Sequence, residues 1–147
     1  MRKLLIGLLL IAAACTTRTT VVPVTTGTGA SGPRPALDAF LAAIRAKDLQ
    51  ALGAAWGNKD GAIRDNKQIT RDDLEKRELV LMCYFSHDSY AVQSDAPAAG
   101  GERVLTVKLT RGTISRTTNF YVVSGGDRWY VRSADMEPVR DLCTKKK

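Results

Sequence analysis

The spacing of the apolar residues changes once along this chain, near residue 88, and this change constrains the fold more than any other feature. Before that point they recur three and four residues apart, as in Leu37, Phe40 and Ile44, which is the spacing of one helix face. After it they alternate with polar residues, as between Leu105 and Leu109, which indicates half-buried strands. Helices followed by an antiparallel meander predict an α+β domain with its helices on one face of the sheet.

Three helices are expected before residue 88. The first follows Pro35, and the second begins after Asp48, whose carboxylate can cap it. The third begins after Thr70, whose hydroxyl can accept a hydrogen bond from the backbone N–H three residues on. Residues 79–85 are almost wholly apolar. We therefore expect the last two turns of the third helix to be buried on all sides, although a buried strand has the same pattern.

Four strands follow, and a two-residue loop at Arg111-Gly112 is expected between the second and third. The strands contain, in order, Tyr90 and Val92, Leu105 to Leu109, Phe120 and Val122, and Trp129 and Val131. The loop pairs Val107 with Arg116, which places a guanidinium on the core side of the sheet. A buried arginine needs a partner or an open cavity. Arg116 is therefore either a pocket residue or the sign of a bulge that re-aims its side chain.

A similar loop at Gly125-Gly126 sets the faces of the last two strands. On the core face it pairs Val122 with Trp129 and Phe120 with Val131. On the outer face it pairs Tyr121 with Tyr130, and Val123 with Arg128. Tyrosine and arginine are enriched in interfaces, so the outer face is a candidate contact surface, made of Tyr121, Tyr130, Arg128 and Arg132. An ordinary solvent-facing sheet explains the same residues.

The amino terminus is typical of a secreted precursor. Arg2 and Lys3 precede an apolar run from Leu4 to Ala14, which is too short to remain as a membrane-spanning helix. The run ends in three alanines and Cys15, which resembles the lipobox of bacterial lipoproteins. The resemblance implies that residues 1–14 are a signal peptide and that Cys15 becomes the lipidated first residue, with three acyl chains as a lasting membrane anchor.

The residues after Cys15 bear on location and domain limits. Thr16 stands where an aspartate would signal inner-membrane retention, so the resemblance favours the inner leaflet of the outer membrane, facing the periplasm. Residues 15–35 are rich in Thr, Gly and Pro and are expected to be a flexible linker. Residues 36–143 then form one domain, and residues 144–147 a basic tail. The modest excess of 22 Lys and Arg over 15 Asp and Glu does not predict a nucleic-acid partner in this compartment.

The element order and the stretch LDAFLAAIRAKDLQALGAAW, from Leu37 to Trp56, resemble the NTF2-like superfamily (SnoaL-like, cystatin-like cone). The resemblance covers residues 36 to about 135 and implies three helices packed on a curved four-strand sheet. It also implies a cone-shaped pocket, which Arg116 and Trp56 would line, and dimerisation through the sheet. The superfamily contains enzymes, ligand carriers and structural modules, so it does not decide the activity.

Two cysteines remain once lipidation has used Cys15. Cys83 and Cys143 are expected to form a disulfide in an oxidising compartment, which would join the end of the third helix to the carboxy terminus. Two buried free thiols are the alternative.

The catalytic inventory is thin. His87 is the one histidine, which excludes a multi-histidine metal site, and its place after a helix end suits capping of carbonyls. Residues 58–63 imitate the middle of a calcium loop, but its first and twelfth positions fall on Trp56 and Lys67. We therefore expect no metal or cofactor, and a membrane-anchored, non-catalytic binding or structural module of the envelope. A small enzyme of the cyclase or dehydratase kind, using the cone pocket, is the alternative.

Overall fold

Helices come first and strands second, as the change of spacing predicts. The computed structural model of the chain describes residues 27–144, so the predicted signal peptide, the predicted lipidation site Cys15 and the last three lysines lie outside the described residues. The elements are α1 Pro33–Ala46, α2 Leu49–Ala55, β1 Gly57–Asn58, β2 Gly61–Ala62, η1 Ile63–Asp65, α3 Arg71–Tyr84, β3 Ser89–Pro97, η2 Ala99–Gly101, β4 Arg103–Arg111, β5 Ile114–Gly125, β6 Arg128–Ala134 and η3 Glu137–Leu142. Across this part of the chain, no helix is both long and apolar enough to span a bilayer.

Both expected helix caps are confirmed. The Asp48 carboxylate accepts a hydrogen bond from the Ala51 N–H at 3.0 Å, and the Thr70 hydroxyl accepts one from the Asp73 N–H at 3.2 Å. These side chains satisfy amides that the first turn of a helix leaves without partners. The apolar stretch that begins at Leu79 therefore belongs to the helix that Thr70 caps, and it is not a buried strand.

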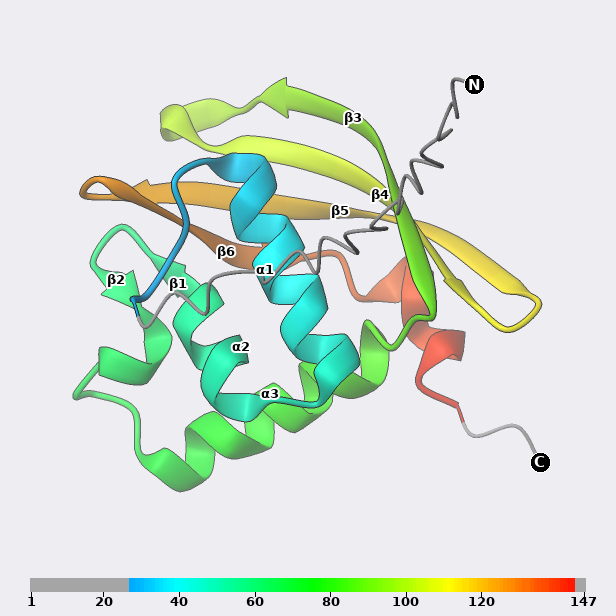
Figure 1. The fold of residues 1–147 in the computed structure, drawn as a ribbon, viewed down its shortest axis with the longest axis horizontal. Coiled ribbons are helices and arrows are strands. Elements are labelled where there is room, and N and C mark those ends of the chain that lie inside the picture. The colour runs from blue at the N-terminus through cyan, green and yellow to red at the C-terminus, as the bar shows by residue number, and fades with distance from the viewer. Residues whose placement is uncertain (1–26, 145–147) are drawn as a thin grey trace, which may run out of the picture.

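The larger sheet is a curved antiparallel meander in the order β3-β4-β5-β6. Helix α1 lies against its concave face, and α3 lies on the far side of α1 and α2 (Figure 1). The prediction of an α+β fold with helices on one face of a curved four-strand sheet is confirmed at this level.

Both hairpin loops lie one residue later than expected. Arg111 pairs with Ile114 and Gly125 with Arg128, so the loops are Gly112-Thr113 and Gly126-Asp127. Each loop begins with a glycine at positive φ, 58° and 69°, where a residue with a Cβ is strained. A shift of the loop by one residue moves a partner by two, which keeps the faces of the strands as far as the Val122–Val131 pair. Arg116 therefore stands opposite Leu109 and not Val107. Beyond the Val122–Val131 pair a register shift intervenes, so Tyr121 pairs with Ser133 and Phe120 with Ala134, three residues from the partners expected.

The concave side of the sheet is filled by side chains. Phe40, Phe85 and Phe120 contact one another edge to face or tilted, with ring centroids 5.1 to 6.5 Å apart. All three rings are buried among leucines and valines of α1, α2, β4 and β5. The space that a cone-shaped pocket would occupy is thus the hydrophobic core.

The expectation that residues 79–85 are buried on all sides is wrong. Leu79 and Val80 are 52% and 48% exposed, whereas Phe85 is fully buried. The one buried residue that α3 itself contributes is Glu78, at 4% exposure. The reason is the layer order: over residues 71–80 α3 packs against α2 and leaves its outer side to solvent, and only from Leu81 on are its side chains at least partly covered.

The ordered domain also begins earlier than residue 36. Ala30 exchanges two backbone hydrogen bonds of 2.9 Å with Trp129 of β6, and the Gly29 N–H donates to the Ala54 carbonyl at 2.8 Å. Pro33 is the first residue of α1, a position where the missing N–H of proline costs nothing. The linker prediction is therefore wrong for residues 28–35, because backbone pairing with the edge of β6 leaves no trace in composition.

Candidate functional site

The two residues expected to line a cone pocket do not come together. Arg116 is exposed and forms an ion pair with Asp141 of η3. Trp56 is half-buried, donates its indole N–H to the Arg132 carbonyl at 3.1 Å and bridges Val131. The β5 partner of Val131 lies six residues beyond Arg116, which is about 20 Å along a strand. The pocket prediction for Arg116 and Trp56 is therefore wrong, since Arg116 sits where the core side of β5 reaches solvent.

The expected contact surface is only partly exposed. Tyr130 is 3% exposed, and Cβ atoms built on Gly29 and Gly57 would lie 2.7 and 2.8 Å from its ring. Arg128 donates to the carbonyls of Thr28 and Gly29 at 3.1 and 2.8 Å. The prediction that Tyr130 and Arg128 form a free surface is wrong, because residues 28–30 and β1 cover this corner.

Tyr121 and Arg132 do lie on the outer face, but they are engaged within the chain. The Tyr121 hydroxyl donates to the Asp135 carboxylate at 3.2 Å, and the Arg132 guanidinium lies 5.8 Å from the centre of the Tyr121 ring. Arg132 also pairs with Glu102 at 2.7 Å. These contacts satisfy the polar groups that an interface partner would otherwise meet.

The disulfide prediction is confirmed. Cys83 and Cys143 are bonded, and their Cα atoms are 4.6 Å apart. The bridge fastens the carboxy end of α3 to the segment after η3, an element that α3 also contacts.

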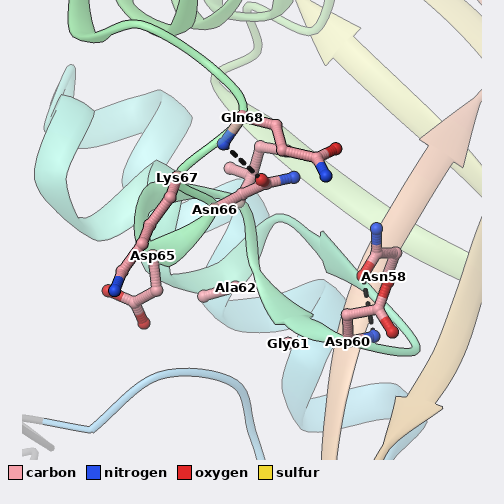
Figure 2. Close-up of a pocket in the computed structure, with 9 residues that line it drawn as sticks. Asn58, Asp60, Gly61, Ala62, Asp65, Asn66, Lys67 and Gln68 are labelled. Carbon is pink, nitrogen blue, oxygen red and sulfur yellow. Dashed lines mark hydrogen bonds between the residues drawn. The ribbon is translucent and has the colours of Figure 1, made fainter.

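The loop that imitates a calcium site surrounds a surface hollow (Figure 2). The Asn58 and Asn66 side-chain oxygens accept backbone hydrogen bonds from Asp60 and Gln68, at 2.8 and 2.9 Å. Figure 2 shows the Asn58–Asp60 turn on one side and the side chains of Asp65 and Lys67 on the other. In residues 27–144 no three His, Cys, Asp or Glu side chains gather as metal ligands.

A second hollow, of about 440 Å³, lies between α2, η1 and α3 and contains Glu78. The Glu78 Oε1 atom is buried and has no hydrogen-bond partner among the described residues. It lies against Gly53, where an added Cβ would be 2.6 Å away. Burial, and after it the nearby charge of Glu75, raises the pKa of Glu78 to about 7.

A third hollow, of about 530 Å³, lies on the other flank of α3 and contains His87. His87 is 5% exposed, and its Nδ1 is 2.8 Å from the Phe85 carbonyl, so the expected capping of a helix-end carbonyl is confirmed. A carbonyl can only accept, so Nδ1 carries a proton. Burial lowers the pKa of His87, which leaves Nε2 as an acceptor, and within the described chain it has no partner.

The two hollows share Leu49, the first residue of α2. They therefore flank α3 on the outer side of the helical layer, and each contains a buried ionisable group with one unpartnered atom. The candidate functional site is this pair of hollows. Sequence reasoning passed over Glu78 because a glutamate within an exposed helical charge pattern gives no signal of burial.

Comparison of the chain with protein-family models, with characterised proteins and with solved structures finds no match.

Proposed function

We propose that this chain is a bacterial envelope lipoprotein, anchored through Cys15, whose NTF2-like domain is a non-catalytic binding module. The observation that carries the binding role is the filled interior: Phe40, Phe85 and Phe120 occupy the concave side of the sheet. A ligand or partner must then be met on the outside of the domain. The hollows that flank α3 are the surfaces offered for this role, because they contain the unpartnered buried groups.

The anchor part of the proposal rests on the amino-terminal sequence. A charged start, an apolar run and the three alanines before Cys15 have the order of a lipoprotein signal peptide. Gly27 is the twelfth residue after Cys15, and a chain of twelve residues spans at most about 43 Å. The domain is therefore held close to the membrane, where lipids and envelope proteins are its available partners.

Replacement of Cys15 tests the anchor. We expect Cys15→Ser to abolish acyl labelling and to leave an unprocessed or soluble species, because no other residue offers the thioether at that place. A second variant, Thr16→Asp, tests the membrane to which the protein is anchored. It should keep lipidation but move the protein from the outer to the inner membrane on a density gradient. Normal acyl labelling of mature Cys15→Ser protein would refute the anchor.

The alternative, a small cyclase or dehydratase working inside the cone, has no observation of its own in its favour. Its expected pocket residues, Arg116 and Trp56, are engaged with Asp141 and with the backbone of β6. We therefore do not propose it.

A further inference from the structure

We propose that the hollow beside His87 binds a single-chain amphipathic carboxylate, with the carboxylate among basic side chains and the alkyl chain along α3. The proposal names the ligand class for the binding role given above and so rests on it, but it does not depend on the anchor at Cys15. Its basis is the coincidence in one hollow of an apolar wall, a basic rim and a buried group without a partner.

The wall is built for an apolar chain. Leu79 and Met82 come from one side of α3, and Ile44 comes from the last turn of α1. Leu79 is 52% exposed. An alkyl chain lying against it and its apolar neighbours would remove apolar surface from water, which is favourable. The volume of about 530 Å³ is within the range of small-molecule sites, which are mostly apolar with a few well-placed polar groups.

The rim is positively charged. Arg45, Lys47 and Arg111 line the hollow, against the one acid Asp88, whose carboxylate already accepts a hydrogen bond from the Gly112 N–H at 2.6 Å. Neither Arg45 nor Lys47 makes an ion pair within the described residues. Two cationic side chains without partners beside an apolar wall favour a ligand with a negative head.

Lys47 occupies a backbone position that glycine would fill more easily. Its φ is 57°, and it is the one non-glycine residue with positive φ in residues 27–144. Helices commonly end with glycine at such a position. A lysine there gives the hollow a cation that glycine could not supply.

His87 explains why the head should be a carboxyl group. Its Nε2 is a buried acceptor without a partner, and Nδ1 is fixed on the Phe85 carbonyl. A carboxylate has lost its acidic hydrogen at neutral pH, so its binding takes up one proton from the solvent, which can lie between a carboxylate oxygen and Nε2. The pair holds this proton in either form, acid with neutral imidazole or carboxylate with imidazolium, so both ring nitrogens are then satisfied.

Titration with decanoate tests the proposal. The protein is residues 16–147, which include every described residue and lack the apolar run from Leu4 to Ala14. We expect saturable binding of one decanoate per chain by calorimetry, at least tenfold tighter than decanol or decylammonium, and none of inorganic phosphate. The ¹⁵N resonance of His87 Nε2 should shift on binding, whereas a merely structural histidine would not respond.

Two neighbouring residues on α3 supply the matched variants. Leu79 lines the hollow and Val80 does not, although their exposures are nearly equal at 52% and 48%. We expect Leu79→Asp to lower the affinity for decanoate at least tenfold and Val80→Asp to leave it unchanged. Both positions are exposed, so both variants should fold.

A second pair tests the charge. Lys47→Gly, combined with Arg45→Gln, should lower the affinity at least tenfold while the fold is kept, because glycine suits the backbone at position 47. The matched control removes two positive charges elsewhere, with Lys59→Gln and Lys108→Gln, and should have little effect.

The proposal is overturned if decanoate does not bind, if decylammonium binds as well, or if Val80→Asp weakens binding as much as Leu79→Asp. Binding to phosphatidylglycerol vesicles without binding of free decanoate also overturns it, because the surface would then recognise a bilayer. None of these results bears on acyl labelling of Cys15, so the two proposals fail separately.

Discussion

At the scale of a single residue, the most unusual feature of α3 is the buried carboxyl group of Glu78. Glu78 is the one residue of that helix that is buried, and its Oε1 atom contacts Gly53 without a hydrogen bond from any described residue. A buried carboxylate without a partner is costly, whereas a neutral carboxyl group is much less so. The raised pKa of about 7 expresses this preference for the protonated form.

The contribution of Glu78 to the stability of the protein should therefore fall as the pH rises. An unfolded chain titrates Glu78 near 4.5 and the folded chain near 7, so between these values the folded state holds a proton that the unfolded state has lost. Stability falls across that window and levels off above it. The shift corresponds to roughly 3 kcal/mol, of which water in the adjoining hollow screens a part. We expect Glu78→Gln to raise the free energy of unfolding at pH 8 by about 1 to 2 kcal/mol, and to change little at pH 4.

Urea titrations at both pH values measure this effect. Glu75→Gln is the control, because Glu75 is exposed and contributes only the smaller, electrostatic part of the pKa change. An equal gain in stability at pH 4 and pH 8 for Glu78→Gln would show that the carboxyl group is not the cause.

At the scale of elements, the disulfide compensates for the weak packing of α3. The helix contacts α2 and η3 more than it contacts α1, and Leu79 and Val80 remain exposed. The Cys83–Cys143 bond closes a separation of 60 residues. Such a cross-link stabilises by restricting the unfolded chain, by about 4 kcal/mol on the chain-entropy estimate.

We therefore expect Cys83→Ala with Cys143→Ala to lower the free energy of unfolding by about 4 kcal/mol, and the wild-type domain to contain no free thiol. Thiol labelling of denatured, unreduced protein checks the second point. Labelling of Cys83 and Cys143 in full yield would contradict the structure. The double variant should expose the α3 amides to hydrogen exchange before those of the sheet.

Element type and order could be predicted from the sequence, because caps and periodicity are local. Asp48, Thr70 and the alternation from Leu105 to Leu109 specify their elements by themselves. The loop positions were missed by one residue, because each dipeptide contains glycine and only the φ of Gly112 and Gly126 shows where the turn starts.

The candidate site was largely beyond sequence reasoning. His87 was placed correctly at a helix end, but its hollow depends on α1, α3 and β4 meeting in space. Tyr130 was expected to be exposed because alternation distinguishes the two faces of a sheet and cannot report what lies over either face. Residues 28–30 and β1 cover the Tyr130 ring, and the spacing of apolar side chains does not predict these backbone contacts.

At the scale of the whole molecule, one core joins the helices to the sheet. Phe40 of α1, Phe120 of β5 and Phe85 at the end of α3 are in mutual contact. The helical layer and the sheet should therefore unfold in one transition.

Phe120→Ala tests this coupling. Removal of a fully buried phenylalanine side chain should lower the free energy of unfolding by about 3 to 5 kcal/mol. The helical circular dichroism and the tryptophan fluorescence should move to the same new midpoint. Thr117→Ala, at an exposed position of the same strand, should leave both midpoints nearly unchanged. Separate midpoints in the Phe120 variant would mean that the two layers are independent.

The attachment of Thr28, Gly29 and Ala30 to the edge of β6 also decides how the domain carries mechanical load. A pull from the amino-terminal side acts first on the two Ala30–Trp129 hydrogen bonds and on the bonds from Arg128 to the carbonyls of Thr28 and Gly29. Because these bonds lie before Pro33, tension enters through the sheet and reaches the first turn of α1 only after they break. If the chain is anchored at Cys15, drag on the domain is borne by its strands, and the hollows beside α3 keep their shape until the edge gives way.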